Sequence, residues 1–162
     1  MPRTTHQLIN VVPLLRTSAL VALAISCTAA WSQTPQGRWI TASGNLEVEI
    51  APCGEALCGS VTKVLANRSM SRDSEDMKPV DTRPALGMKI LTDFKPDDME
   101  GNQAVSWKGE IYNRENGKTY SCQMSMGSGG QLIVRPYVVL PLFGKTQIWQ
   151  HAPAAPTASS QR

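Results

Sequence analysis

The pattern of apolar and polar positions along the chain predicts β-strands rather than helices. From residue 37 onward, short runs in which apolar and polar residues alternate, or in which β-branched residues dominate, are separated by Gly, Pro, Asn and Asp. No window of eleven or more residues has the helical period, so the pattern is typical of an all-β chain. We expect eight strands, at residues 37–42, 45–52, 57–65, 87–93, 104–113, 118–126, 131–139 and 144–152.

Eight short antiparallel strands that each bury one face predict a single up-and-down β-barrel. Closure into a barrel removes the two exposed edges that an open sheet of these strands would keep. A β-sandwich of two packed sheets is the alternative arrangement. The connection over residues 66–84 carries charges of both signs, two prolines and scattered methionines, and we expect it to be a surface loop.

The strand-pairing register of one hairpin can be predicted from its turn residues. Asn116 and Gly117 stand between two strands and favour a two-residue turn, since both residue types tolerate positive φ. In that register Met124 faces Gly109, and one surface of the hairpin is apolar while the other is polar. The apolar surface comprises Trp107, Gly109, Ile111, Cys122, Met124 and Met126. Cys122 is therefore expected to point into the barrel.

Cys53 and Cys58 are expected to form a disulfide. They lie at the two ends of the run CGEALC, between two alternating segments, as the ends of a hairpin loop do. Closing so short a loop is worth roughly 2 kcal/mol in the chain-entropy model, and it pins the register of the hairpin. Metal binding is the alternative, but two thiolates supply only half of a tetrahedral site. In the same hairpin Lys63 falls on the inner face, which predicts a β-bulge that turns it outward.

Charge and composition exclude several classes of function. The chain has 16 Lys and Arg and 13 Asp and Glu; residues 1–32 hold two of the basic residues and none of the acidic ones, which leaves 14 against 13 beyond them. This balance gives no electrostatic reason to expect nucleic acid or an anionic membrane surface as the partner. His6 and His151 are the only histidines, so a three-histidine metal site cannot form, and no glycine-rich phosphate-binding motif is present.

Residues 1–32 are interpreted as a cleaved secretory signal peptide. Arg3 and Arg16 precede an uncharged apolar run over residues 18–30 that ends in small residues. Cleavage after Ser32 fits best and makes 33–152 the barrel domain, with cleavage after Ala29 or Ala30 as the alternative. The run is shorter than the roughly 20 apolar residues that span a bilayer, so an integral membrane protein is not expected.

Four segments together resemble the DUF2147 family. They are Gly37-Arg38-Trp39, EIAPCGEALCG at 49–59, GEIYNRENGKTY at 109–120 and PLFGKTQIW at 141–149. The family comprises small exported bacterial proteins of unassigned function whose fold is similar to that of lipocalins. The resemblance implies that Gly37 and Trp39 begin the first strand and that Trp39 closes one end of the barrel. In lipocalin-like barrels an Arg of the last strand stacks across this Trp, and here His151 or Lys145 is expected to take its place.

Export from a bacterial cell places the protein in the periplasm or in the medium. A lipid-modified Cys27 is the alternative, although Ala24 stands where a lipoprotein signal normally has Leu. The tail over residues 153–162 is too poor in apolar side chains to pack and is expected to be disordered.

Six side chains are candidates for ligand binding. Those expected to line the interior are Trp107, Tyr120, Met124 and Met126. Arg83 and Arg135 resemble arginines of the family and are candidates for holding an anionic group. Plain core packing, and the capping of loops by the arginines, is the alternative for all six. Met124 and Met126 beside Gly109 supply adaptable side chains and a gap, which favours a bound ligand over a filled interior.

Two functions are consistent with these features. The first is an exported lipocalin-like protein that catalyses nothing and holds a small lipophilic or amphipathic molecule in the barrel. The second is an envelope protein whose barrel is filled and whose surface binds another protein. No cofactor or metal is expected, and an enzyme is not expected because His151 lies at the edge of the domain. The acidic residues from Asp93 to Glu100 predict a solvated loop rather than a calcium site.

Overall fold

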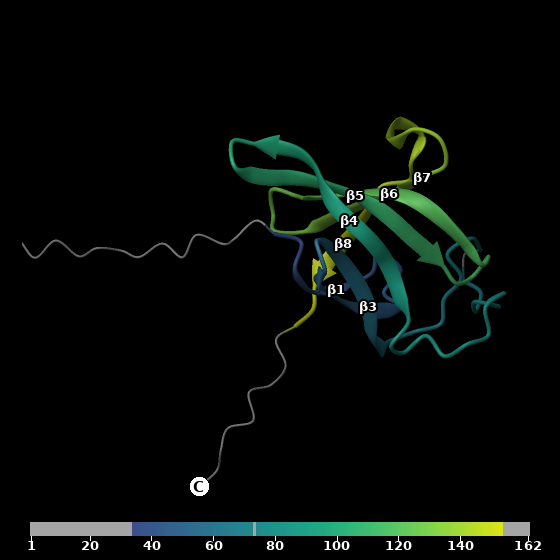
Figure 1. Ribbon diagram of the computed structural model, residues 1–162. Coiled ribbons are helices and arrows are strands. Elements are labelled where there is room, and N and C mark those ends of the chain that lie inside the picture. Colours follow the sequence, from purple (N-terminus) through teal and green to yellow (C-terminus); the bar gives the residue numbers. More distant parts are fainter. Residues whose placement is uncertain (1–33, 73, 154–162) are drawn as a thin grey trace, which may run out of the picture. The chain divides into compact units, whose positions relative to one another are not determined.

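The strands follow one another around a closed antiparallel barrel in the order of the sequence (Figure 1). The structure is a computed structural model and describes residues 34–72 and 74–153. The strands are β1 (Gly37–Ile40), β2 (Leu46–Cys53), β3 (Ala56–Val64), β4 (Lys89–Glu100), β5 (Gln103–Asn113), β6 (Lys118–Met126), β7 (Leu132–Tyr137) and β8 (Gln147–His151), with one 3₁₀ turn, η1 (Pro141–Phe143). The expected all-β, up-and-down barrel is confirmed. The expectations for the signal peptide, for Cys27 and for the tail beyond Pro153 fall outside the described residues.

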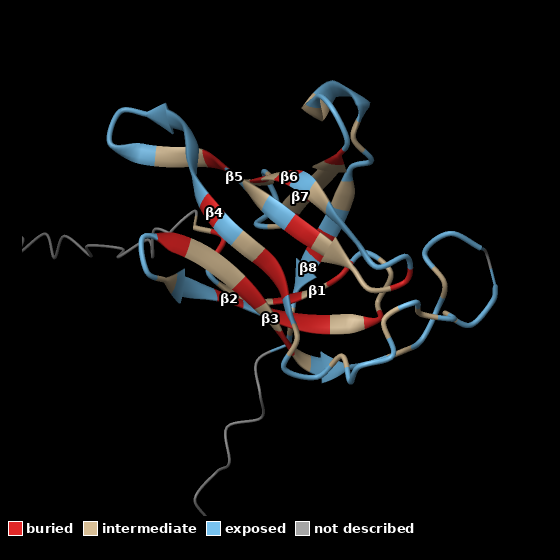
Figure 2. Cartoon of the chain, turned by 45° about the vertical axis from the view of Figure 1, so that its right-hand side comes forward, coloured by how far each residue is buried: buried red, intermediate tan, exposed pale blue. Residues whose placement is uncertain are grey.

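Alternation along each strand produces the core. Along β2, β3, β5 and β6, more buried residues tend to alternate with more exposed ones (Figure 2). One face of each strand is therefore the buried one. The buried core comprises Trp39, Val48, Ile50, Val61, Ile90, Leu91, Phe94, Trp107, Ile111, Cys122, Met124, Leu132, Val134 and Trp149. Burial of such side chains, at roughly 25 cal/mol per Å² of apolar surface, is the main force that holds the barrel together.

The β5–β6 hairpin has a different register from the one that its turn residues predict. Asn113 pairs with Lys118, so the loop has four residues rather than two, and only Gly117 has a positive φ, of 69°. The buried carboxylate of Glu115 explains the longer loop, because the Ser69 hydroxyl donates to it over 2.5 Å from the β3–β4 connection. The pairing is shifted by two residues from the predicted one. Because side chains alternate with a period of two, each side chain stays on its expected face of the sheet although its partner changes.

The bulge expected near Lys63 is confirmed. The register of β2 and β3 shifts between Glu47 and Val48, and the Lys63 side chain is exposed. Lys63 donates to the buried carboxylate of Glu47 over 3.1 Å, and Thr62 donates to it over 3.0 Å. Burial raises the pKa of Glu47, but the hydrogen bonds from Lys63 and Thr62 outweigh it, so the pKa is lowered.

Strand β4 corrects the prediction of a solvated loop after Asp93. The strand continues to Glu100 and forms a long hairpin with β5 that extends beyond the rest of the barrel (Figure 1). Asp93 has a φ of 55° and lies at the first of three irregularities in the pairing, which let the strand accommodate Pro96. The outer part of this hairpin is exposed, as a loop would be, but its backbone is paired.

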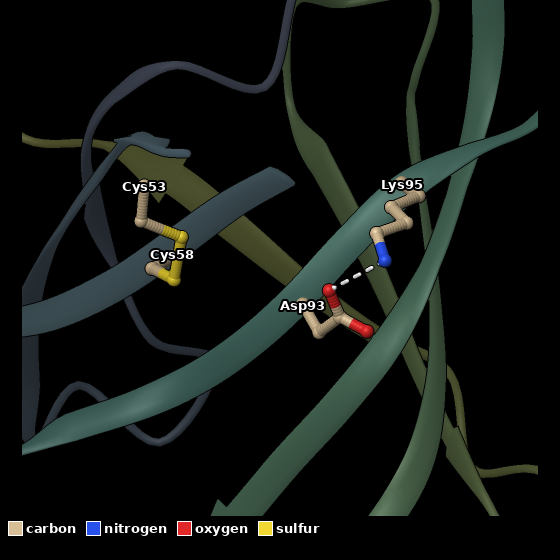
Figure 3. The surroundings of a disulfide bond; sticks show 4 residues. All are labelled: Cys53, Cys58, Asp93 and Lys95. Atoms are coloured by element: carbon tan, nitrogen blue, oxygen red, sulfur yellow. Dashed lines mark ion pairs between the residues drawn. A yellow bond between two sulfur atoms is a disulfide. The ribbon is translucent and has the colours of Figure 1, made fainter. Parts of the chain in front are cut away.

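The disulfide between Cys53 and Cys58 is confirmed, with Cα atoms 5.8 Å apart. Figure 3 shows it beside β4, where the Lys95 ammonium lies 3.1 Å from the Asp93 carboxylate. Cys122 is fully buried in the core, and burial raises the pKa of its thiol to about 12. A disulfide of this kind suggests a location outside the cytoplasm.

One half of the barrel interior is filled by side chains. The position of a Cβ at Gly109 would lie 2.8 Å from the Phe94 ring, and that of a Cβ at Gly59 would lie 2.7 Å from Leu91. The gap expected beside Gly109 is therefore absent, because Phe94 fills it. We call this half the closed end; the opposite, open end carries the connections 41–45, 65–88, 114–117 and 138–146.

Candidate ligand cavity

A cavity of about 390 Å³ lies at the open end of the barrel. Its floor is formed by residues of β2 to β8, among them Val61, Ile90, Ile111 and Trp149. Its rim is formed by the four connections at this end, including Met70 and Met77 of the 65–88 connection and Phe143 of η1. The volume lies within the range of about 300–1,000 Å³ that is usual for small-molecule sites.

The wall of the cavity is mainly apolar and contains flexible side chains. Three methionines, Met70, Met77 and Met88, contribute to it, together with Leu46 and Val64. Methionine is unbranched and polarisable, so it adapts to ligands of irregular shape. These side chains give the cavity an adaptable apolar wall.

The charged groups of the cavity are few. Arg114 and Lys145 are the charged side chains among the described residues that line it, and both are basic. Tyr137 is 6% exposed and lines the same cavity. Its hydroxyl is buried and has no hydrogen-bond partner within residues 34–72 and 74–153, which costs about 1–3 kcal/mol for a buried polar group. The other polar side chains that line the cavity are uncharged: Thr41, Ser43, Asn45, Asn67, Tyr112, Asn113, Tyr120 and Gln147.

The 65–88 connection is fastened across the rim by Glu115. This buried carboxylate accepts hydrogen bonds from the Ser69 and Ser71 hydroxyls, at 2.5 and 2.9 Å, and from the Met70 amide, at 2.9 Å. Burial raises the pKa of Glu115, but these hydrogen bonds outweigh it and the pKa is lowered. The charged carboxylate therefore holds Met70 at the cavity.

A second attachment of the same connection is made by Asp81. Its carboxylate accepts from the Arg83 guanidinium, over 2.9 Å to Nε, and from the Tyr112 hydroxyl over 2.7 Å. The hydrogen bonds from Arg83 and Tyr112 hold the pKa of Asp81 well below its usual range, and the bond to Asp81 raises the pKa of Tyr112. Arg114 then donates to the Arg83 carbonyl, which links the connection to the β5–β6 turn.

The structure places one of the six candidate residues at the cavity. Tyr120 lines it, and its hydroxyl accepts a hydrogen bond from Asn116 over 2.8 Å. Trp107 and Met124 are buried in the core, and Met126 packs against it, but none of the three lines the cavity. The register that put these side chains inside the barrel did not show at which end they lie.

The two candidate arginines serve the connections rather than the cavity. Arg83 is exposed, is paired with Asp81, and borders a separate open hollow on the outer surface. Arg135 donates to the Pro141 and Leu142 carbonyls and to the Thr146 hydroxyl. Its guanidinium therefore fixes the connection between β7 and β8.

Most of the residues that line the cavity were not predicted from the sequence. Methionines of the 65–88 connection reach the cavity from a segment that was expected to be a surface loop. Their spacing follows neither a helical nor a strand period, so the sequence does not predict which way these methionines face. The single local signal was the concentration of Met70, Met77 and Met88 near one connection, since exposed loops seldom hold so many.

At the closed end, Trp39 and His151 lie against each other. Trp39 is fully buried and its indole donates to the Pro35 carbonyl over 2.8 Å. The His151 ring stacks on it, with ring centroids 3.8 Å apart. His151 is thus the residue, of the two that the sequence offered, that covers Trp39. Gly37, with a φ of 124°, begins β1 where the His151 ring is 4.0 Å from the position of its missing Cβ.

The closed eight-stranded barrel with a cavity at one end is a lipocalin-like fold. A family model described as "Uncharacterized protein conserved in bacteria (DUF2147)" matches residues 37–151, and the chain belongs to this family. The search of curated proteins found no match.

A solved structure with a similar fold is described as "Protein HP1028 from the human pathogen Helicobacter pylori belongs to the lipocalin family". The two proteins are 19% identical, the TM-score is 0.53, and the match covers 76% of this chain and 86% of that chain. At this identity the likeness concerns the fold. Within residues 34–72 and 74–153, no helix is both long and apolar enough to cross a membrane.

Proposed function

We propose that the protein binds a small amphipathic molecule in the open-end cavity. The observation that carries this proposal is the cavity itself, which is about 390 Å³ in volume, mainly apolar and bordered by two basic side chains. A largely preformed apolar pocket with a few convergent polar groups is the usual form of a small-molecule site. The lipocalin-like fold agrees with such a function.

The polar groups indicate the chemistry of the ligand. Arg114 and Lys145 lie on the cavity, and none of the described residues that line it is acidic. The best match is therefore an apolar body that ends in an anionic group, such as a long-chain carboxylate.

The proposal includes binding without catalysis and an exported location. The polar side chains of the cavity are hydroxyls, amides and two basic groups, which orient a ligand by hydrogen bonds and charge. A fatty-acid ester incubated with the protein should accordingly be recovered intact. The disulfide supports export, and the apolar run over 18–30 supports periplasmic delivery by a signal peptide.

Titration with a fluorescent fatty acid tests the proposal. Ala85 is half-buried and lines the cavity, so Ala85→Phe fills part of it; Ala51→Phe adds the same group on an exposed position of β2. We expect the wild type and Ala51→Phe to bind alike, and Ala85→Phe to bind at least about tenfold more weakly, which corresponds to 1.4 kcal/mol. The proposal would be refuted if Ala85→Phe bound the fatty acid as tightly as Ala51→Phe, or if the wild type did not bind it.

A further inference from the structure

A group of exposed apolar side chains protrudes next to the cavity. We call residues 138–143 the apolar tip. Its exposed side chains are Val138, Val139, Leu140, Leu142 and Phe143, with exposed fractions from 53% to 80%. Figure 2 shows this segment, between β7 and β8, as a projection coloured as exposed. A group of exposed apolar side chains of this kind usually marks a site of interaction.

The tip is held in shape and several of its backbone carbonyls are paired within the chain. The Leu140 carbonyl accepts from the Phe143 amide over 3.0 Å, and the Pro141 carbonyl accepts from the Gly144 amide over 3.0 Å. The Arg135 guanidinium covers the carbonyls of Pro141 and Leu142. An apolar medium demands such pairing, because it offers no water to backbone groups. The tip therefore presents apolar side chains over a partly satisfied backbone.

The charged residues that flank the tip in the sequence are basic. No Asp or Glu occurs between residues 116 and 162, although the balance beyond residue 32 is nearly neutral. Lys145 follows the tip and is exposed, and Lys118 is exposed at the start of β6. Acidic residues lie on the β4–β5 hairpin at the other end of the barrel, with Asp97, Asp98 and Glu100. Those in the 65–88 connection, at the same end as the tip, include Glu75 and Asp81, which form ion pairs with Arg72 and Arg83. This distribution is complementary to an anionic lipid surface.

The tip also forms part of the cavity rim. Val138, Phe143 and Lys145 line the cavity, whereas Val139 and Leu142 do not line it and are exposed, with exposed fractions of 76% and 78%. A partner that covers the tip therefore lies at the entrance of the cavity. A fluid bilayer suits a convex apolar projection, since it needs no groove of matching shape.

We propose that the apolar tip inserts into the interfacial region of a phospholipid membrane, with Lys145 at the anionic headgroups. The tip then brings the cavity entrance to the membrane, so that an amphipathic ligand passes between the bilayer and the cavity. The proposal of membrane docking depends on the tip and not on the cavity function. The proposal that a ligand passes between bilayer and cavity depends on the proposed function as well.

Flotation with phospholipid vesicles tests the docking. The chain from residue 33 onward is suitable, because the barrel closes between Gly37 and His151 and its core lies within these residues. Val139→Ser with Leu142→Ser removes two apolar groups that do not line the cavity. Met99→Ser with Ile148→Ser, at 49% and 47% exposure, is the matched control outside the tip. The vesicles contain phosphatidylcholine, with or without phosphatidylglycerol.

We expect the wild type and the control to float with the vesicles, more strongly with phosphatidylglycerol, and the tip variant to partition at least about tenfold less. Leu142→Trp should show a blue shift of emission on the same vesicles. No flotation of the wild type, or equal flotation of the tip variant, would overturn docking. Self-association of the wild type through the tip, without vesicle binding, would also overturn it.

Fatty-acid titration without vesicles separates the two proposals. The tip variant should bind the fatty acid as the wild type does, because its cavity is unchanged. Vesicle binding without fatty-acid binding would refute the cavity function and leave docking. Fatty-acid binding without vesicle binding would refute docking and leave the cavity function.

Discussion

The Trp39 indole and the His151 imidazole stack at the closed end of the barrel, with 3.8 Å between ring centroids and 28° between ring planes. They join the first strand to the last, since Trp39 and His151 are also paired in the β1–β8 ladder. The resemblance to lipocalin-like barrels implied an Arg at this contact. Here the imidazole ring of His151 provides this cover.

Trp39→Ala should destabilise the protein by about 3–5 kcal/mol, the usual cost of deleting a buried aromatic. His151→Ala should cost less, about 0.5–1.5 kcal/mol, because it removes one exposed partner of a stacked pair. Urea unfolding followed by circular dichroism measures both. A loss below about 1 kcal/mol for Trp39→Ala would contradict its place in the core.

Thiol counting checks the cysteines. The chain from residue 33 onward contains Cys53, Cys58 and Cys122, of which the first two are bonded and the third is buried. We expect no reaction with a thiol reagent in the native state at pH 8, because burial raises the pKa of Cys122 to about 12 and blocks access. One thiol should react after denaturation without reductant. Three reactive thiols would show that the disulfide does not form.

Gly109→Ala should destabilise the barrel by about 1–3 kcal/mol, the range of overpacking in a core. The new methyl group would lie 2.6 Å from the Thr92 carbonyl oxygen and 2.8 Å from the Phe94 ring. Gly129→Ala is the control, since its methyl group meets only the Gln131 side chain, at 3.7 Å or more. Thermal unfolding should separate the two variants. Equal stability would mean that the space beside Gly109 is open.

Local sequence patterns predicted much of the fold but less of the site. Alternation determined which residues face inward, because a strand has a period of two whatever its partner. It did not determine the length of β4, since Pro96 and the nearby acidic residues are typical of a loop. Phe94 was therefore not expected inside the barrel, where it fills the space beside Gly109.

The cavity depended on contacts between distant segments. Glu115 holds Ser69 and Met70 across more than forty positions of sequence, and this contact also lengthens the turn at Gly117. No local pattern records such a contact. The disulfide and the bulge at Lys63 could be predicted because each depends only on two adjacent strands.

Glu115→Gln should loosen the 65–88 connection and lower the stability at pH 7 by about 1–3 kcal/mol, since hydrogen bonds to a charged acceptor are lost. The folded-state pKa of Glu115 is lowered, so the carboxylate stabilises the fold above its unfolded pKa of about 4.5. That contribution is lost as the pH falls through the folded value. The variant and the wild type should therefore converge in acid. Unfolding curves measured from pH 7 to pH 3 test this, and a constant difference would contradict it.

Methionine methyl groups offer the most direct test of the cavity as the binding site. Met70, Met77 and Met88 line the cavity, whereas Met99, Met124 and Met126 do not. In NMR spectra of protein labelled at the methionine methyls, titration with a long-chain carboxylate should shift the first three resonances. The other three should stay in place. Shifts at Met124 and Met126, or no shifts at all, would contradict binding in the open-end cavity.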